Sequence, residues 1–173
     1  MGKRSDFKRR KNDSYDTPYK AFLPLIPHLI PGSFFCEPCA GKGDLINHLM
    51  RHDFYLTCAY DIEPRAPIVK KMDAILLNKW TIHSADYIIT NSPWTRQILH
   101  PLIEVFRNIT TTWLLLDADW MQTKQASPYL DYCSLIVSIG RVRWIPDSPY
   151  DGKDNCCWYR FGKDKTETIF KGR

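Results

Sequence analysis

The stretch that decides the fold is SFFCEPCAGKGD, residues 33–44. Its first five residues, 33–37, form a short apolar run bounded by a glycine and a proline, which is typical of a buried strand. The GKG triplet at 41–43 predicts a tight turn, because glycine adopts backbone angles that other residues avoid. Asp44 is then placed to cap a helix that has apolar residues at helical spacing. The expected order is strand, glycine turn, helix.

The alternation of strand and helix continues toward the carboxyl end. Helical spacing recurs in residues 97–106, and the long connection 141–154, rich in proline, aspartate and glycine, predicts an antiparallel hairpin. The expected fold is therefore α/β and Rossmann-like, a mostly parallel seven-stranded sheet with a C-terminal antiparallel hairpin. The strands are expected at residues 33–37, 54–60, 73–77, 86–90, 111–117, 135–139 and 156–161.

The net charge of the chain is concentrated at its N-terminus. Residues 1–12 hold six basic side chains against Asp6, a net of +5 that equals the net charge of all 173 residues. The remainder sums to zero, which excludes a uniformly basic nucleic-acid coat. We expect a flexible basic arm at residues 1–14 and a single domain at 15–173, with no separate target-recognition domain. The basic side chains of the arm are Lys3, Arg4, Lys8, Arg9, Arg10 and Lys11.

Other features of the sequence exclude several classes of protein. No apolar stretch reaches the roughly 20 residues that a membrane span needs, and the N-terminus lacks the apolar region of a signal peptide. We therefore expect a cytoplasmic protein without a membrane partner. The six cysteines are expected to be reduced and packed in the core. We expect no metal site, because the CxxC of Cys36 and Cys39 has no second pair at zinc spacing.

Three groups of polar residues directly follow expected strands. Residues 37–43 follow the first strand, Asp61 follows the second, and NSPW, residues 91–94, follows the fourth. In an open parallel sheet, the carboxyl ends of the strands form the ligand crevice. Each group alone is also explained by an ordinary turn or helix cap. Their shared position predicts a single binding site.

The turn after the first strand, EPCAGKGD, resembles the cofactor motif of class I methyltransferases that use S-adenosyl-L-methionine (AdoMet). The resemblance implies the class I methyltransferase fold and AdoMet as cofactor, with the glycine backbone close to its methionine part. It implies that Asp61 binds the ribose hydroxyls and that Ile62 packs on adenine. Asp73 is matched to the residue that accepts from the adenine amino group, with Asp86 and Ser84 as competing assignments. The cofactor residues implied in the turn itself are Glu37, Ala40, Gly41 and Gly43.

The second motif, Asn91-Ser92-Pro93-Trp94, resembles the [D/N/S]PP[Y/F/W] motif of methyltransferases that act on exocyclic amino groups. The resemblance implies that the Asn91 side-chain oxygen and the Ser92 carbonyl accept from the two N6 hydrogens of adenine. The nitrogen lone pair is then directed at the methyl group. Trp94 is expected to stack on a base flipped out of the nucleic acid. Ser92 departs from the family's usual proline, which removes one fixed backbone angle from the loop.

The third motif, YDTP at residues 15–18, resembles the Y-x-T-P motif that precedes the glycine motif in DNA N6-adenine methyltransferases, including the small bacteriophage enzymes. The resemblance implies that Tyr15, Thr17 and Pro18 lie at the methionine end of the cofactor. It predicts methyl transfer to adenine N6 in DNA, in a bacterial or phage-infected host cell. The alternatives are an RNA adenine N6 or a cytosine N4 methyltransferase, or a catalytically weak protein that binds AdoMet or nucleic acid.

DNA is the expected partner, with RNA as the alternative, and the basic arm is expected to contact phosphates. Arg141 and Arg143, with Trp144, are expected to meet residues 158–160 across the hairpin, either as a nucleic-acid contact or as cross-strand packing. Asp117, Asp119 and Trp120 either border the base pocket or begin a capped helix, and the second interpretation is favoured. The oligomeric state is left open between monomer and homodimer.

Overall fold

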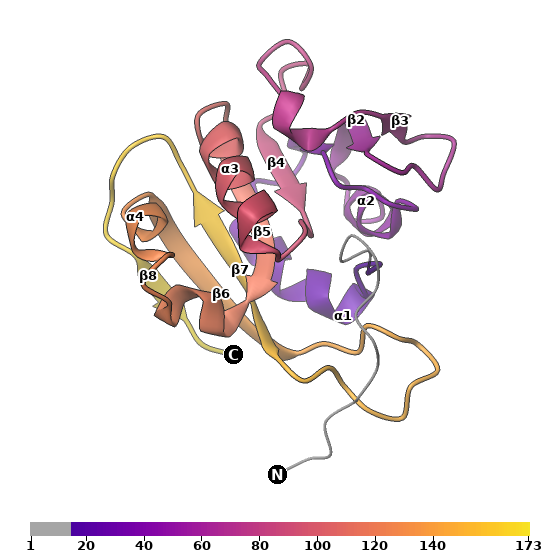
Figure 1. Ribbon diagram of the computed structural model, residues 1–173. Coiled ribbons are helices and arrows are strands. Elements are labelled where there is room, and N and C mark those ends of the chain that lie inside the picture. The colour runs from indigo at the N-terminus through magenta and orange to yellow at the C-terminus, as the bar shows by residue number, and fades with distance from the viewer. Residues whose placement is uncertain (1–14) are drawn as a thin grey trace.

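The computed structural model describes residues 15–173, so the predicted basic arm lies outside the described residues. An eight-stranded sheet with the order β3-β2-β1-β4-β5-β7-β6-β8 forms its centre (Figure 1). The first five strands of that order are parallel, and β7 is antiparallel to both of its neighbours. The predicted α/β, mostly parallel fold with a C-terminal antiparallel hairpin is confirmed. The long strands are β1 (Phe34–Glu37), β2 (Tyr55–Asp61), β4 (Tyr87–Thr90), β5 (Thr111–Asp117), β6 (Cys133–Arg141) and β7 (Asn155–Phe161).

Helices cover both faces of the sheet. Strand β5 shows why, because successive side chains of a strand point to opposite faces. Trp113 and Leu115 belong to one buried cluster, and Leu114 and Leu116 belong to the other. The first cluster is closed by α1 (Tyr19–Phe22), the 3-10 helix η2 (Leu23–His28) and α2 (Asp44–Met50). The second is closed by α3 (Arg96–Arg107), α4 (Ser127–Leu130) and the 3-10 helices η3 (Ala74–Leu76) and η4 (Ala118–Gln122).

The glycine turn after β1 follows the sequence prediction except at the helix start. Gly41 and Gly43 both have positive φ, +54° and +86°, which favours glycine at these positions. Gly43 is the N-cap of α2, so the prediction that Asp44 caps the helix is wrong by one position. Asp44 instead occupies the first turn, where its negative charge is favourable at the helix N-terminus.

The strand expected at residues 73–77 is also wrong. The chain forms the 3-10 helix η3 there, because the Asp73 side chain accepts from the Ile75 backbone N–H at 3.1 Å and turns the backbone. The parallel edge strand β3 (Lys70–Lys71) comes earlier and pairs with the end of β2. The eighth strand, β8 (Ile169–Lys171), was not predicted and pairs in parallel with β6.

The register of the hairpin corrects another expectation. Arg141 lies opposite Asn155, and Arg160 lies opposite Leu135, so residues 141–144 do not meet residues 158–160 across the hairpin. Trp158 and Tyr159 are fully buried, and the Arg160 guanidinium lies 5.7 Å from the ring centre of Trp113. Packing therefore accounts for residues 158–160.

No helix within residues 15–173 is long and apolar enough to cross a membrane.

Candidate active site

A cavity of about 570 Å³ opens at the carboxyl ends of β1, β2 and β4. Segment 15–17, the glycine turn, the loop after β2, η3 and the start of α3 surround it. Pro18 and Gly43 do not line it, because Pro18 precedes α1 and Gly43 caps α2. The predicted cofactor residues that do line it are Tyr15, Thr17, Glu37, Ala40, Gly41, Asp61, Ile62 and Asp73.

Asp61 joins two walls of this cavity. Its Oδ2 accepts from the Gly41 backbone N–H at 2.8 Å, and its Oδ1 accepts from the Glu63 backbone N–H at 2.8 Å. The carboxylate therefore fixes the glycine turn against the loop after β2. The positive φ of Gly41 and the absence of a Cβ allow the backbone itself to form the cavity wall.

Glu37 lies at the floor of the cavity in an unusual environment for a carboxyl group. The residue is 2% exposed, and its Oε2 has no hydrogen-bond partner among the described residues. Burial raises the pKa of Glu37 well above its ordinary value, and the nearby Asp61 and Asp44 raise it further. A buried acceptor without a partner is costly unless a ligand supplies a donor. Glu37 is therefore suited to a cationic or N–H-bearing ligand.

The charges that line the cavity are strongly unequal. Asp16, Glu37, Asp44, Asp61, Glu63 and Asp73 contribute six carboxyl groups, against the two cations Arg65 and Lys71. A cavity of this sign favours a positively charged ligand and disfavours the phosphates of a nucleotide.

A second cavity, of about 560 Å³, lies on the other side of the NSPW loop. It is formed by the start of α3, the turn from β5 into η4, and the hairpin connection. Tyr15 and Asn91 line both cavities, so the two spaces meet at these residues. The other lining residues include Trp94, Arg96, Asp117, Asp119, Trp120, Trp144, Lys153 and Asp154.

Asn91 is held at the junction by the N-terminal segment. Its Nδ2 donates to the Tyr15 backbone carbonyl at 3.1 Å, which leaves the side-chain Oδ1 as a hydrogen-bond acceptor. Pro93 lines the first cavity, whereas Ser92 lines neither. Ser92 is 2% exposed, and its Oγ has no partner among the described residues. The predicted contact of its carbonyl with an amino group therefore stays a prediction.

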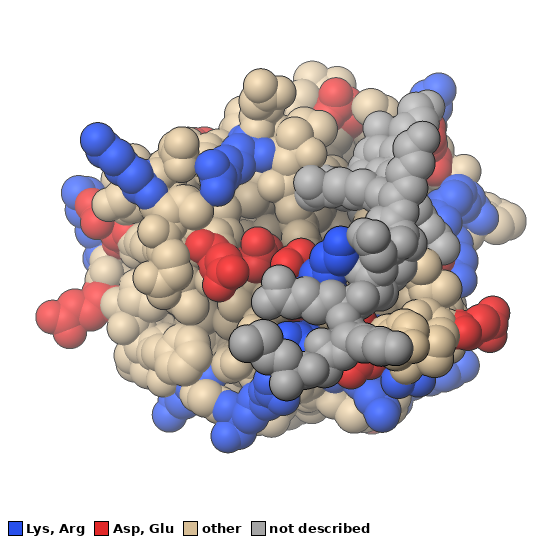
Figure 2. All heavy atoms as spheres, turned by 60° about the horizontal axis from the view of Figure 1, so that its bottom comes forward, with Lys and Arg blue, Asp and Glu red and all other residues tan. Residues whose placement is uncertain are grey.

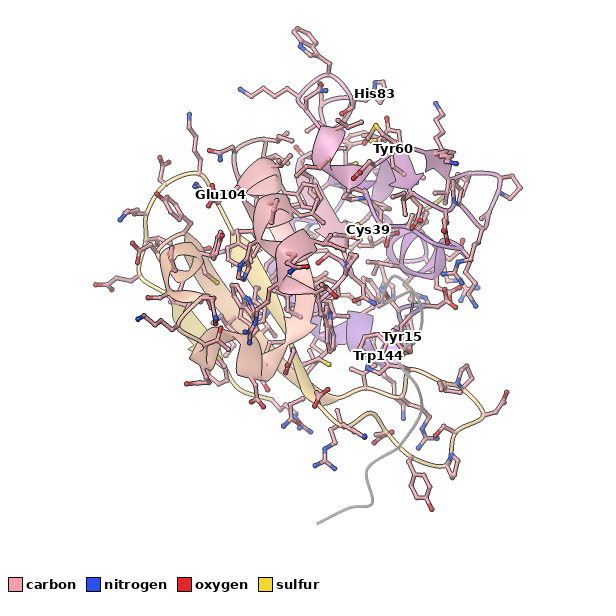
Figure 3. All side chains as sticks on the ribbon, in the orientation of Figure 1. Tyr15, Cys39, Tyr60, His83, Glu104 and Trp144 are labelled. Atoms are coloured by element: carbon pink, nitrogen blue, oxygen red, sulfur yellow. The ribbon has the colours of Figure 1, made fainter. Side chains whose placement is uncertain are left out.

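Aromatic rings form part of the second cavity. The Trp94 indole donates through Nε1 to the Leu115 backbone carbonyl at 3.0 Å, which fixes the ring orientation. Trp144 packs edge-on against Trp94 with ring centres 5.8 Å apart, and its ring centre is 6.0 Å from that of Tyr15. Figure 3 shows Tyr15 and Trp144 side by side. The cavity thus offers planar apolar surface next to the Asn91 acceptor.

Of the two sequence interpretations of the turn after β5, the helix cap is confirmed and the border of a base pocket stays a prediction. The Asp117 side chain caps η4 by accepting from the Asp119 backbone N–H at 2.9 Å, as the favoured interpretation predicts. Asp117, Asp119 and Trp120 also line the second cavity. The sequence analysis did not identify Arg65, Lys71, Lys153 or Asp154, because none belongs to a motif and only the folded chain brings them to the cavities.

The predicted nucleic-acid contacts outside the two cavities stay predictions. Arg141 and Arg143 are both exposed, and Arg143 donates to Asp151 at 3.2 Å. Neither lines the two cavities, so their proposed contact with nucleic acid stays a prediction. Figure 2 shows the face that carries the strand ends, with acidic side chains near its centre and most Lys and Arg side chains toward its edge. The arm residues Lys3, Arg4, Lys8, Arg9, Arg10 and Lys11 lie outside the described residues.

The cysteines are free thiols, and Cys39 lines the first of the two cavities. Burial raises the pKa of Cys39, which keeps it a neutral thiol beside the first cavity. Within residues 15–173, no cluster of three or more histidine, cysteine or acidic side chains is suited to a metal ion.

Solved structures with the same fold have low sequence identity to this chain. A putative RNA methyltransferase from Pyrococcus horikoshii matches with a TM-score of 0.62 at 17% identity, covering 94% of this chain and 93% of that one. The M protein of the type I restriction enzyme EcoKI matches with a TM-score of 0.56 at 13% identity, covering 90% of this chain and 48% of that one. A predicted O-methyltransferase from Agrobacterium tumefaciens has a TM-score of 0.56 at 11% identity, with 88% and 85% covered.

No protein-family model and no curated protein matches the sequence. At these identities the likeness shows the fold alone, an α/β fold shared with structures that are named as methyltransferases.

Proposed function

We propose that this protein transfers the methyl group of AdoMet to the exocyclic N6 amino group of adenine in DNA. The observation that carries the proposal is the meeting of two cavities at Asn91 and Tyr15. One cavity is acidic and lies at the strand ends, and the other is aromatic and large enough for a base. A methyl donor and an amino acceptor would then face each other across the Asn91 side chain.

The residues of the first cavity fit AdoMet. The sulfonium and amino groups of AdoMet are cationic, which matches the six carboxyl groups that line the cavity. The buried Glu37 Oε2, which has no partner among the described residues, would accept from an N–H group of the cofactor. Asp61 would hold the ribose hydroxyls and Asp73 the adenine amino group, next to the half-exposed Ile62.

When bound, AdoMet supplies an electrophilic methyl group on its sulfonium. The Asn91 Oδ1 and the Ser92 carbonyl would accept from the two hydrogens of adenine N6 and turn its lone pair toward the first cavity. The Tyr15 carbonyl holds the Asn91 amide in this orientation. Trp94 and Trp144 would enclose the base and keep bulk water from the reacting atoms. As N6 gains the methyl group, the methyl–sulfur bond would break with its electron pair left on sulfur, and the surplus N6 proton would pass to solvent as the product leaves.

DNA is favoured by the YDTP motif at residues 15–18, and the type I restriction M protein shares the fold. RNA is the second candidate, because the match to the structure named as a putative RNA methyltransferase extends over nearly the full length of both proteins. The basic arm would supply phosphate contacts to either polymer.

Methyl-labelled AdoMet, offered with duplex DNA, single-stranded DNA and RNA in separate reactions, tests the proposal. Transfer of label to DNA, recovered as N6-methyladenine, is expected. Transfer to RNA alone would move the function to the second candidate. AdoMet binding without transfer to any of the three polymers would indicate a protein that binds AdoMet but does not catalyse transfer. Ser92→Pro would then be the first substitution to test for recovery of transfer.

A further inference from the structure

The cofactor cavity has few groups that can pair with an anion. AdoMet carries a carboxylate on its methionine part in addition to its cationic groups. Six carboxyl groups line the cavity, and a seventh carboxylate placed among them requires a nearby cation. Among the described residues, only Arg65 and Lys71 line the cavity with a positive charge.

Arg65 lies over the glycine turn. Its backbone N–H donates to the Gly41 carbonyl at 3.0 Å, and its guanidinium lies so close to Gly41 that a Cβ there would be 2.5 Å from Nη2. The same Nη2 donates to Asp16 Oδ1 at 2.8 Å. The guanidinium therefore lies between the glycine turn and segment 15–17, at the end of the cavity assigned to the methionine part.

The geometry of the guanidinium leaves donors for a ligand. The group has five N–H donors in a planar fork, and Asp16 is its hydrogen-bond partner within the described residues. The Arg65 side chain is 39% exposed and lines the cavity, so the donors that Asp16 does not use are accessible to a ligand. A fork of this shape matches a carboxylate through two parallel hydrogen bonds.

The other cations lie elsewhere. Lys71 ends β3 and is paired in register with Asp61, on the side of the cavity assigned to ribose and adenine. Lys42 does not line this cavity and instead contacts Asp16 at 3.3 Å and Asp44 at 3.2 Å.

We propose that Arg65 binds the methionine carboxylate of AdoMet and thereby selects a cofactor with an intact amino-acid end. The proposal rests on AdoMet as the cofactor and does not depend on which polymer is methylated. No sequence motif marks Arg65, because its role follows from the fold of the loop after β2 over the glycine turn.

The test compares AdoMet with decarboxylated AdoMet, which lacks only the carboxylate, by isothermal titration calorimetry without nucleic acid. Arg65→Gln is expected to weaken AdoMet binding on the order of 10- to 100-fold. Its affinity for decarboxylated AdoMet should stay within about twofold of the unchanged protein, which also shows that the cavity remains folded. Arg65→Lys should recover part of the loss, because it restores the charge but not the fork.

Lys71→Gln is the matched control, since it removes the other cation of the cavity. It should leave the ratio of the two affinities unchanged. Equal losses for both ligands in Arg65→Gln, no loss for either, or a ratio that changes in Lys71→Gln instead would overturn the role of Arg65. Failure of the unchanged protein to bind AdoMet would refute the proposed function itself, which separates the two outcomes.

Discussion

Replacing Glu37 by glutamine should move stability and cofactor affinity in opposite directions. The side chain is almost fully buried, and one of its oxygens has no partner among the described residues. In the cofactor-free protein this carboxyl group lowers the stability of the folded state, because its ionisation in the buried position is unfavourable. With AdoMet bound, the same carboxylate would gain a cationic N–H donor under the proposed assignment. Glutamine keeps the shape and removes the charge.

The binding loss follows from the interaction that would be removed. A hydrogen bond to a charged group contributes about 1.5 to 3 kcal/mol, so Glu37→Gln should weaken AdoMet binding roughly 10- to 150-fold. The gain in stability follows from the cost of the carboxyl group in the cofactor-free protein. Glutamine is still a buried polar group, but it does not titrate, so it removes the cost of keeping a proton on Glu37, or of burying its charge, at a pH where the unfolded carboxyl is ionised. The cofactor-free variant should therefore unfold at a higher denaturant concentration near pH 8.

The sign of the pH dependence follows from the raised pKa of Glu37. The folded protein keeps this proton to a higher pH than the unfolded chain, whose value is near 4.5. Its contribution to stability is therefore complete below about pH 4.5 and is lost as the pH rises through the folded pKa. Glutamine has no such proton, so the stability advantage of the variant should grow with pH.

Urea unfolding between pH 4 and pH 9, and calorimetric titration with AdoMet, measure both effects. Glu167→Gln, the same chemical change at an exposed position outside the cavities, is the control and should alter neither quantity. A Glu37→Gln protein that binds AdoMet as tightly as the unchanged protein would refute the assigned contact. One that loses stability as the pH rises, relative to the unchanged protein, would refute the electrostatic argument.

Three further changes test other parts of the site. Gly41→Ala should destabilise the protein by about 1 to 2 kcal/mol, because φ at this position is +54°, and it should also weaken AdoMet binding. Gly162→Ala is the control: its added Cβ would meet no atom within 4 Å, so the urea midpoint should change little. Asn91→Ala should lower methyl transfer by about 100-fold or more in single-turnover assays while AdoMet affinity changes far less, and transfer that persists would remove Asn91 from the base site. Deleting residues 1–12 should reduce the salt dependence of DNA binding, and equal slopes before and after deletion would make the arm a passive tail.

Much of the site could be predicted because its residues are local in sequence. The turn at 41–43 needs glycine for its backbone angles, and the strands at 33–37 and 111–117 are continuous apolar runs. Polar residues that follow such strands gather at one edge whatever the loops do. Asp61, Asn91, Pro93 and Trp94 accordingly line the cavities at that edge, whereas Ser92 lines neither.

The features that the sequence did not predict have three causes: a local side-chain bond, a loop contact and a register shift. Asp73 follows an extended stretch, yet its side chain bonds to the backbone two residues ahead and starts a 3-10 helix in place of the expected strand. Arg65 carries no motif, and only the loop after β2 brings it over Gly41. The pairing of Arg141 with Asn155 depends on irregularities in the register of β6, which have no sequence signature.

The most direct test of the account is the chemical identity of the methylated product. The protein would be incubated with methyl-labelled AdoMet and unmethylated DNA, and the DNA digested to nucleosides for mass spectrometry. Label in N6-methyladenine is expected, together with its loss in Asn91→Ala. Label on cytosine or on a ring carbon, or label on N6 that survives Asn91→Ala, would contradict a site built around this side chain.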